Sequence, residues 1–74
     1  MITKTQAMSL RVGQTLYHTI NRNADGTPQR WRVNGACKTW ATRPDAFRVP
    51  IKYGLKTCDY LDESNGHLLY PEPR

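Results

Sequence analysis

The sequence has few cysteines, no long apolar run and few acidic residues. Two cysteines, Cys37 and Cys58, are too few to cross-link a disulfide-rich secreted domain. No apolar stretch approaches the roughly 18–20 residues that a membrane-spanning helix requires. The polar segment 2–6 lacks the apolar centre of a signal peptide. We therefore expect a cytoplasmic protein with reduced thiols and no membrane partner.

Recognisable catalytic motifs are lacking as well. The two histidines, His18 and His67, lie on different segments, and no nucleophile elbow or phosphate loop surrounds either cysteine. So short a chain is also expected to leave little room for a ligand cavity of about 300 Å³ or more. The histidines and cysteines are the right ligands for zinc, but no two of them have the close spacing of a compact zinc site. We predict that the protein is not an enzyme and has no catalytic residues, metal site or cofactor.

Acidic residues are scarce over most of the chain. The 74 residues include 11 Lys and Arg against six Asp and Glu, for a net charge of +5. Residues 1–56 hold ten of the basic residues and two acidic ones, a formal charge of +8, whereas residues 57–74 carry a formal charge of −3. A basic field of this kind attracts phosphate polymers and acidic protein surfaces.

What the sequence does have is a series of short alternations of apolar and polar residues. Between residues 29 and 33, for example, apolar Trp31 and Val33 alternate with arginines. This period of two is typical of strands with one buried face. The segments expected to form strands are residues 15–20, 29–33, 37–42, 47–53 and 67–70.

Turn-forming residues separate these segments. Asn34-Gly35 predicts a tight hairpin, with 37–42 as the returning strand, although Gly35 could instead form a bulge with the turn one or two residues later. Pro50 lacks a backbone donor, so its strand is expected at a sheet edge or with a bulge. The polar residues 21–28 predict a long exposed loop.

Together these signals predict an all-β fold, a small and partly open SH3-like barrel of about five strands. One short helical turn is expected near the C-terminus, through residues 63–65, with Gly66 ending it. Residues 1–8 are expected to form a flexible leader, and residues 9–74 a single domain. Because so small a core is marginal, a homodimer is an alternative to a monomer.

Four segments within residues 10–70 resemble those of a known group of proteins. They are Gly13-Gln14-Thr15-Leu16-Tyr17, Trp31-Arg32-Val33, Lys38-Thr39-Trp40-Ala41-Thr42 and Arg48-Val49-Pro50-Ile51-Lys52-Tyr53-Gly54-Leu55. In these segments the chain resembles small uncharacterised proteins encoded by phages and prophages of enteric bacteria. The resemblance implies an accessory phage protein that acts in the bacterial cytoplasm on nucleic acid or on a host protein, and it implies no particular functional residues.

A basic and aromatic group in the middle of the chain is the strongest functional signal. Cations bind phosphates, and aromatic rings stack on bases. The residues expected to bind RNA or DNA, with low specificity, are Arg30, Arg32, Lys38, Trp40, Arg48 and Lys52. Both tryptophans could instead be core residues, with the cations merely solvating the outer face. The alternative function is a protein–protein interaction module that modulates a host or phage factor, through the residue 21–28 loop or an edge strand.

Overall fold

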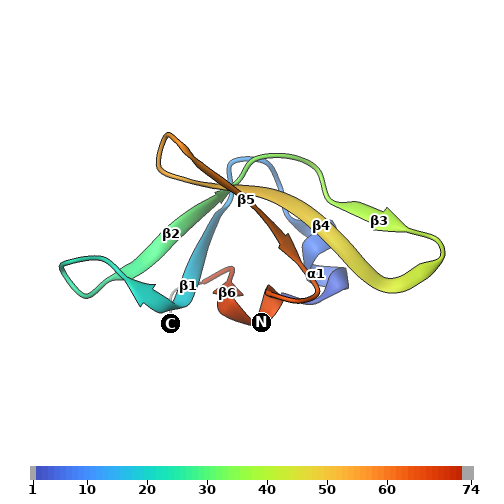
Figure 1. Ribbon diagram of the computed structural model, residues 1–74, viewed down its shortest axis with the longest axis horizontal. Helices are drawn as coiled ribbons and strands as arrows, with labels where there is room; N and C mark the ends of the chain where they lie inside the picture. The colour runs from blue at the N-terminus through green and yellow to red at the C-terminus, as the bar shows by residue number, and fades with distance from the viewer. Residues whose placement is uncertain (1, 73–74) are drawn as a thin grey trace.

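The computed structural model describes residues 2–72 (Figure 1). Residue 1 of the predicted leader and residues 73–74 of the predicted domain lie outside this range. The elements are, in chain order, α1 (Lys4–Ser9), β1 (Thr15–Arg22), β2 (Pro28–Val33), β3 (Lys38–Trp40), β4 (Arg43–Tyr53), β5 (Thr57–Asp62), the 3₁₀ turn η1 (Gly66–Leu68) and β6 (Leu69–Tyr70). The fold is therefore mainly β, as the alternating pattern predicts.

The sheet is built around β4. Its strand order is β3-β4-β2-β1-β6, all pairs are antiparallel, and β5 also pairs with β4. Along one edge of β4, β3 and β2 pair with successive stretches, while β5 pairs along the other edge. The sheet stays open, and the β1–β2 and β3–β4 hairpins project at opposite ends of a molecule measuring 43 × 22 × 17 Å (Figure 1). The SH3-like barrel is accordingly not confirmed.

The core lies on one face of this sheet. Alternate residues of β4, namely Phe47, Val49 and Ile51, are buried there, together with Leu16 of β1 and Leu61 of β5. Each of these side chains leaves water almost completely, and burial of such a side chain contributes roughly 1.5–3 kcal/mol. The intervening β4 residues Arg48, Pro50 and Lys52 lie on the opposite face of the sheet.

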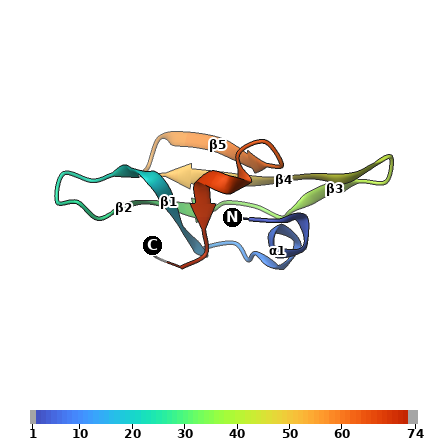
Figure 2. The same cartoon turned by 90° about the horizontal axis from the view of Figure 1, so that it is seen from below.

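The N-terminal segment belongs to this core, in contrast to the predicted leader. Thr3 caps α1 with a capping box. The Thr3 hydroxyl accepts a hydrogen bond from the backbone amide of Gln6, and the side-chain oxygen of Gln6 accepts one from the backbone amide of Thr3. Ile2 and Ala7 are buried in the core cluster, and the Ile2 amide donates to the Gly66 carbonyl at 2.8 Å. Because residues 3–6 are polar, the sequence pattern did not indicate that Ile2 and Ala7 belong to the core. Figure 2 shows α1 and β5 on opposite sides of β4.

The chain does not reverse at Asn34-Gly35. Both β2 and β3 run antiparallel to β4 along the same edge, and the reversal comes after β3, at residues 41–42. Residues 34–37 form a bulge between β2 and β3, where the Asn34 amide donates to the Pro50 carbonyl at 2.8 Å. Since the amide and carbonyl of one strand residue point to the same side, the missing donor of Pro50 faces this bulge. A Cβ on Gly35 would lie 2.9 Å from Cγ of Pro50, so the two residues fit each other.

Other boundaries also differ from the prediction. β5 was not foreseen, because only Leu61 in it is buried and its two aspartates are unfavourable in strands. The predicted loop of residues 21–28 is shorter, since Arg22 pairs with Pro28 at the end of the β1–β2 hairpin. The helical turn lies at η1 rather than at residues 63–65, and α1 is the α-helix of the described chain.

His18 shapes β1. Between two paired positions, β1 advances five residues from Tyr17 to Arg22, whereas β2 advances two from Pro28 to Arg30. The backbone amides of Ile20 and Asn21 within this bulge donate to Nδ1 of His18, at 3.1 and 2.9 Å. Nδ1 must therefore be unprotonated. Burial also lowers the pKa of His18, in agreement with this role as an acceptor.

If the N-terminal segment is part of the core, Ile2→Ala should lower the free energy of unfolding by about 2 kcal/mol or more, because it removes buried methyl groups. Thr5→Ala, an exposed position on α1, is the matched control and should change it by at most about 0.5 kcal/mol. Urea unfolding followed by tryptophan fluorescence measures both. Equal effects of the two substitutions would show that Ile2 lies outside the folded unit.

A second prediction concerns pH. Because the folded pKa of His18 is lowered, the unfolded chain binds a proton more readily, so stability should be complete above about pH 6.5 and decrease below it. Urea unfolding between about pH 7.5 and 5.5 should show this slope, and His18→Gln should flatten it. The pH range in which His18 affects stability is separate from that of the carboxylates Asp25, Asp62 and Glu63. Their pKa values are lowered in the folded protein, so their contribution to stability is lost only below about pH 4. An unchanged slope in His18→Gln would exclude His18 as its source.

Candidate nucleic-acid interface

Five cations lie on the face of the sheet opposite the core. Lys38 of β3 pairs with Arg48 of β4, and Arg32 of β2 pairs with Lys52 of β4. Paired residues share a face, and so do residues two apart along a strand, which adds Arg30 beside Arg32. The intervening β4 residues are the buried ones, so this cationic face, defined by these five residues, points outward. All five side chains are exposed or half-buried.

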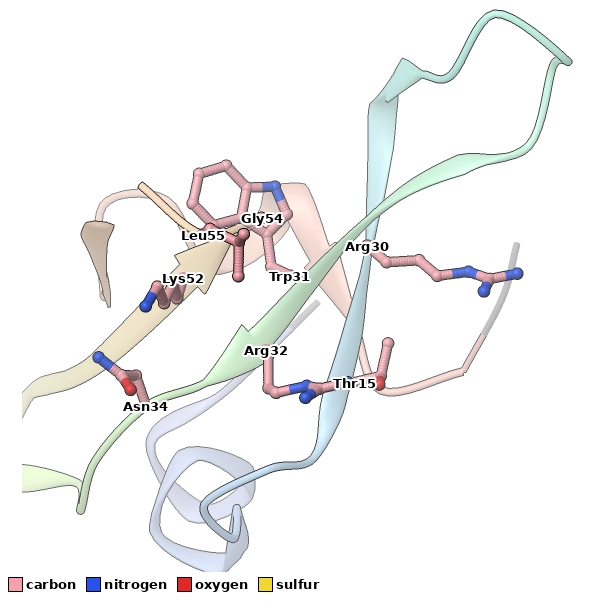
Figure 3. A pocket seen from close by; sticks show the side chains of 8 residues that line it. All are labelled: Thr15, Arg30, Trp31, Arg32, Asn34, Lys52, Gly54 and Leu55. Carbon is pink, nitrogen blue, oxygen red and sulfur yellow. The ribbon is translucent and has the colours of Figure 1, made fainter. Parts of the chain in front are cut away.

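A groove of about 560 Å³ opens at one end of the cationic face (Figure 3). Arg30 and Arg32 extend from β2 towards β1, whereas Lys52 and Asn34 lie on the other side of β2. The residues that line the groove are Thr15, Arg30, Trp31, Arg32, Asn34, Lys52, Gly54 and Leu55. None of these is acidic, and neither Arg32 nor Lys52 forms an ion pair with any residue in the range 2–72. The volume exceeds the small cavity expected of so short a chain.

Trp31 lines the groove from the core face of β2, where it pairs with Leu16 and is held in place by neighbouring side chains. Its ring packs against Tyr53 with centroids 5.3 Å apart, and its Nε1 donates to the Gln29 side chain at 3.0 Å. Trp31 is half-buried and packs against the edge of the core. It therefore serves both as a core residue and as a groove residue.

At the other end of the cationic face, three cations surround Trp40. The charged groups of Lys38, Arg43 and Arg48 lie 5.8, 5.7 and 5.6 Å from its ring centroid. The register shift after Thr39 places Arg43 opposite Trp40 and so brings it to this cluster. Cation–π attraction offsets part of the repulsion among these charges. Trp40 thus organises cations on the face and does not belong to the core cluster.

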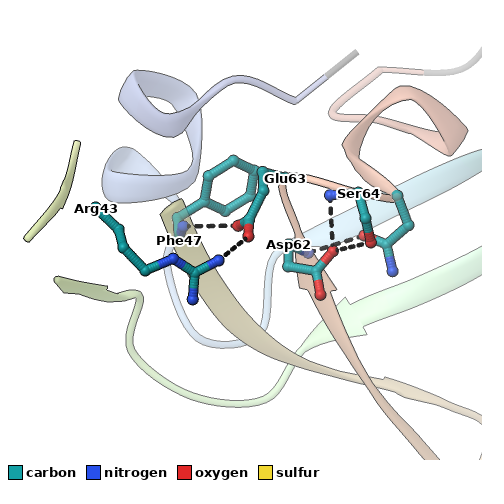
Figure 4. A network of polar contacts seen from close by, with 6 residues as sticks. Arg43, Phe47, Asp62, Glu63 and Ser64 are labelled. Atoms are coloured by element: carbon teal, nitrogen blue, oxygen red, sulfur yellow. Dashed lines mark hydrogen bonds and ion pairs between the residues drawn. The ribbon is translucent and has the colours of Figure 1, made fainter. Parts of the chain in front are cut away.

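Two carboxylates moderate the charge of the Trp40 cluster (Figure 4). Glu63 accepts from the Arg43 guanidinium at 3.0 Å and from the Phe47 amide at 3.1 Å. Its own backbone amide and that of Phe47, together with the Arg43 charge, hold the pKa of Glu63 below its usual value. The Ser64 hydroxyl, and to a smaller extent Arg48, lower the pKa of Asp62, which pairs with Arg48 across β4 and β5. Carboxylates therefore offset less of the positive charge at the groove end of the cationic face than at the Trp40 end.

The six residues singled out from the sequence form two groups in the structure. Arg30, Arg32 and Lys52 line the groove, and Lys38, Arg48 and Trp40 cluster at the other end of the cationic face. Sequence reasoning missed Arg43, which reaches the face only through the register shift, and Tyr60, whose ring lies 5.2 Å from the Arg48 guanidinium. It also missed Asn34 and Leu55, because nothing in the sequence of their turns indicated that they lie near Trp31.

Among the residues considered for catalysis and zinc binding, Cys58 lies on the cationic face, paired with Lys52. Nδ1 of His18 is occupied by backbone amides, and burial raises the pKa of the Cys37 thiol, which keeps it in its less reactive form. Within residues 2–72, no three His, Cys, Asp or Glu side chains are grouped as metal ligands would be. A second hollow, of about 80 Å³ beside His18 and Leu69, is much smaller than typical ligand sites.

Comparisons with protein-family models, with curated proteins and with solved structures find no match to this chain. The described helices include none that is long and apolar enough to cross a membrane. The resemblance to phage-encoded proteins therefore stays a prediction.

The charge around Trp40 can be measured through its fluorescence. In Trp31→Phe, where Trp40 is the remaining tryptophan, iodide should quench the emission more strongly than caesium, because three cations attract the anion. The difference should shrink in Lys38→Gln and at salt concentrations near about 1 M. Equal quenching by iodide and caesium at low salt would contradict the cluster.

Proposed function

We propose that the protein binds nucleic acid through the cationic face and is not an enzyme. The observation that carries the proposal is the register of β2 against β4, which pairs Arg32 with Lys52 beside a groove free of acidic residues. Like charges placed opposite each other on neighbouring strands repel and lower the stability of the sheet. A bound phosphate relieves that repulsion and releases counterions, which favours polyanions as ligands.

The arrangement of the face suits an extended polyanion. Arg48 and Lys52 are four residues apart on β4, or about 13 Å at the rise of a strand, so the groove and the Trp40 cluster can contact separate phosphates. Contacts to phosphates give affinity without sequence preference. The protein accordingly acts as an accessory factor of low sequence specificity, in the bacterial cytoplasm that the resemblance implies.

The alternative, a protein-interaction module, receives less support from the sheet edges. β4 is paired on both edges, so Pro50 does not mark an open edge strand. On the outer edge of β5, the Asn65 side chain already bonds the Asp62 amide at 2.8 Å and the Tyr60 carbonyl at 2.9 Å. A strand from a partner would have to displace these bonds.

Titration of fluorescently labelled RNA and DNA at several salt concentrations tests the proposal. Arg32→Gln and Lys52→Gln should each weaken binding, and the two substitutions together should reduce the slope of log K against log salt by about 0.7–0.9, the value for one phosphate contact. Arg11→Gln removes the same charge from an exposed loop and should leave the slope unchanged.

Absence of binding to either RNA or DNA at low salt would exclude the proposed function. Recovery of a single bacterial protein by the immobilised chain, undiminished by nuclease, would then favour the interaction module. Equal effects of Arg11→Gln and Arg32→Gln would place the binding surface elsewhere.

A further inference from the structure

The groove has an apolar wall that phosphate binding does not explain. Leu55 lines it beside Trp31 (Figure 3), although its side chain is 89% exposed and makes no contribution to the core. Leu55 follows Gly54, whose φ of +65° allows the tight β4–β5 turn that places it there. A duplex bound through its backbone would leave both apolar residues in water. The groove thus combines cations with a surface suited to a flat apolar group.

We propose that the nucleic acid is single-stranded and that one unpaired base lies in this groove, against Trp31 and Leu55. This inference rests on the nucleic-acid function proposed above and names its substrate class. The phosphate beside that base contacts Arg32 and Lys52. The volume of about 560 Å³ lies within the range of roughly 300–1,000 Å³ usual for small-ligand sites and accommodates a nucleotide.

The positions of the cations fit a nucleotide and its neighbour. The Cβ atoms of directly paired residues such as Arg32 and Lys52 lie about 4.5–5.5 Å apart. Both side chains can therefore reach one phosphate once Arg32, which extends towards Thr15 in Figure 3, turns towards Lys52. Arg30 is two residues, about 7 Å, further along β2 and can contact the next phosphate. Asn34 lines the groove with an amide that can donate to and accept from a base edge.

Trp40 is less suited to stacking on a base. Three cations already lie within 6 Å of its ring centre, and a base would have to displace at least one of them. We therefore assign the Trp40 cluster to phosphates and the Trp31 groove to the base. Bases within a duplex already stack on each other, so only an unpaired base offers its face to Trp31.

The test compares an oligothymidylate of about 12 nucleotides with a duplex of the same length, by fluorescence anisotropy at low salt. Leu55→Ala should weaken binding of the single strand roughly 3- to 10-fold. This is the affinity expected from a base that covers about half of the leucine side chain, which the variant loses. Binding of the duplex should not change. Met8→Ala removes a similarly exposed apolar side chain from α1 and is the matched control; neither substitution touches the core.

Trp31 provides an independent readout. In Trp40→Phe, oligothymidylate should quench the remaining tryptophan, whereas inorganic phosphate should not. If the wild-type protein binds single strand and duplex equally well and Leu55→Ala has no effect, the groove inference is wrong while the cationic face stands. If neither nucleic acid binds but polyglutamate does, with the same dependence on Leu55, the groove takes an acidic peptide and both proposals fail.

Discussion

Antiparallel pairing of β4 on both edges is the constraint on which the rest of the structure depends. Because β4 alternates from Phe47 to Lys52, the same register that buries Phe47, Val49 and Ile51 turns Arg48 and Lys52 outward. A slip of one residue would expose the core and bury the cations. The core and the cationic face are therefore specified together. Pro50 is tolerated at the centre of this strand because the bulge at Gly35 lies where its donor is missing.

Side chains complete the hydrogen bonding where the open sheet lacks strands. Glu63 accepts from the Phe47 amide beyond the end of β5, and Asn65 bonds the outer edge of β5 itself. His18 accepts from two amides of the bulge in β1. Uncapped edge groups of this kind promote association between chains. Such caps occupy backbone groups that a strand of a second sheet would otherwise pair with.

The strand alternation was readable from the sequence, but the tertiary pairing was not. The opposite faces of Arg32 and Val33, and of Lys52 and Ile51, follow from a period of two and agree with the structure. The partner of each strand depends on whether the chain reverses at Asn34-Gly35, and the fit of Gly35 against Pro50 makes it continue instead. That contact joins residues 15 positions apart, so no local pattern announces it.

Two further features were hidden for similar reasons. Ile2 and Ala7 flank the polar segment 3–6, and their burial depends on α1 packing against β4. The six candidate binding residues could be named from charge and aromatic content alone. Their division into a groove and a Trp40 cluster required the register, as did the arrival of Leu55 beside Trp31.

The most direct measurement is a double-mutant cycle between Arg32 and Lys52, with the affinity for oligothymidylate at low salt as the readout. If the β2–β4 register directs both cations to one phosphate, the combined loss in Arg32→Gln/Lys52→Gln should differ from the sum of the single losses by about 0.5 kcal/mol or more. Strict additivity, with both single variants weakened, would mean that the two side chains serve separate sites and would contradict their shared contact with one phosphate.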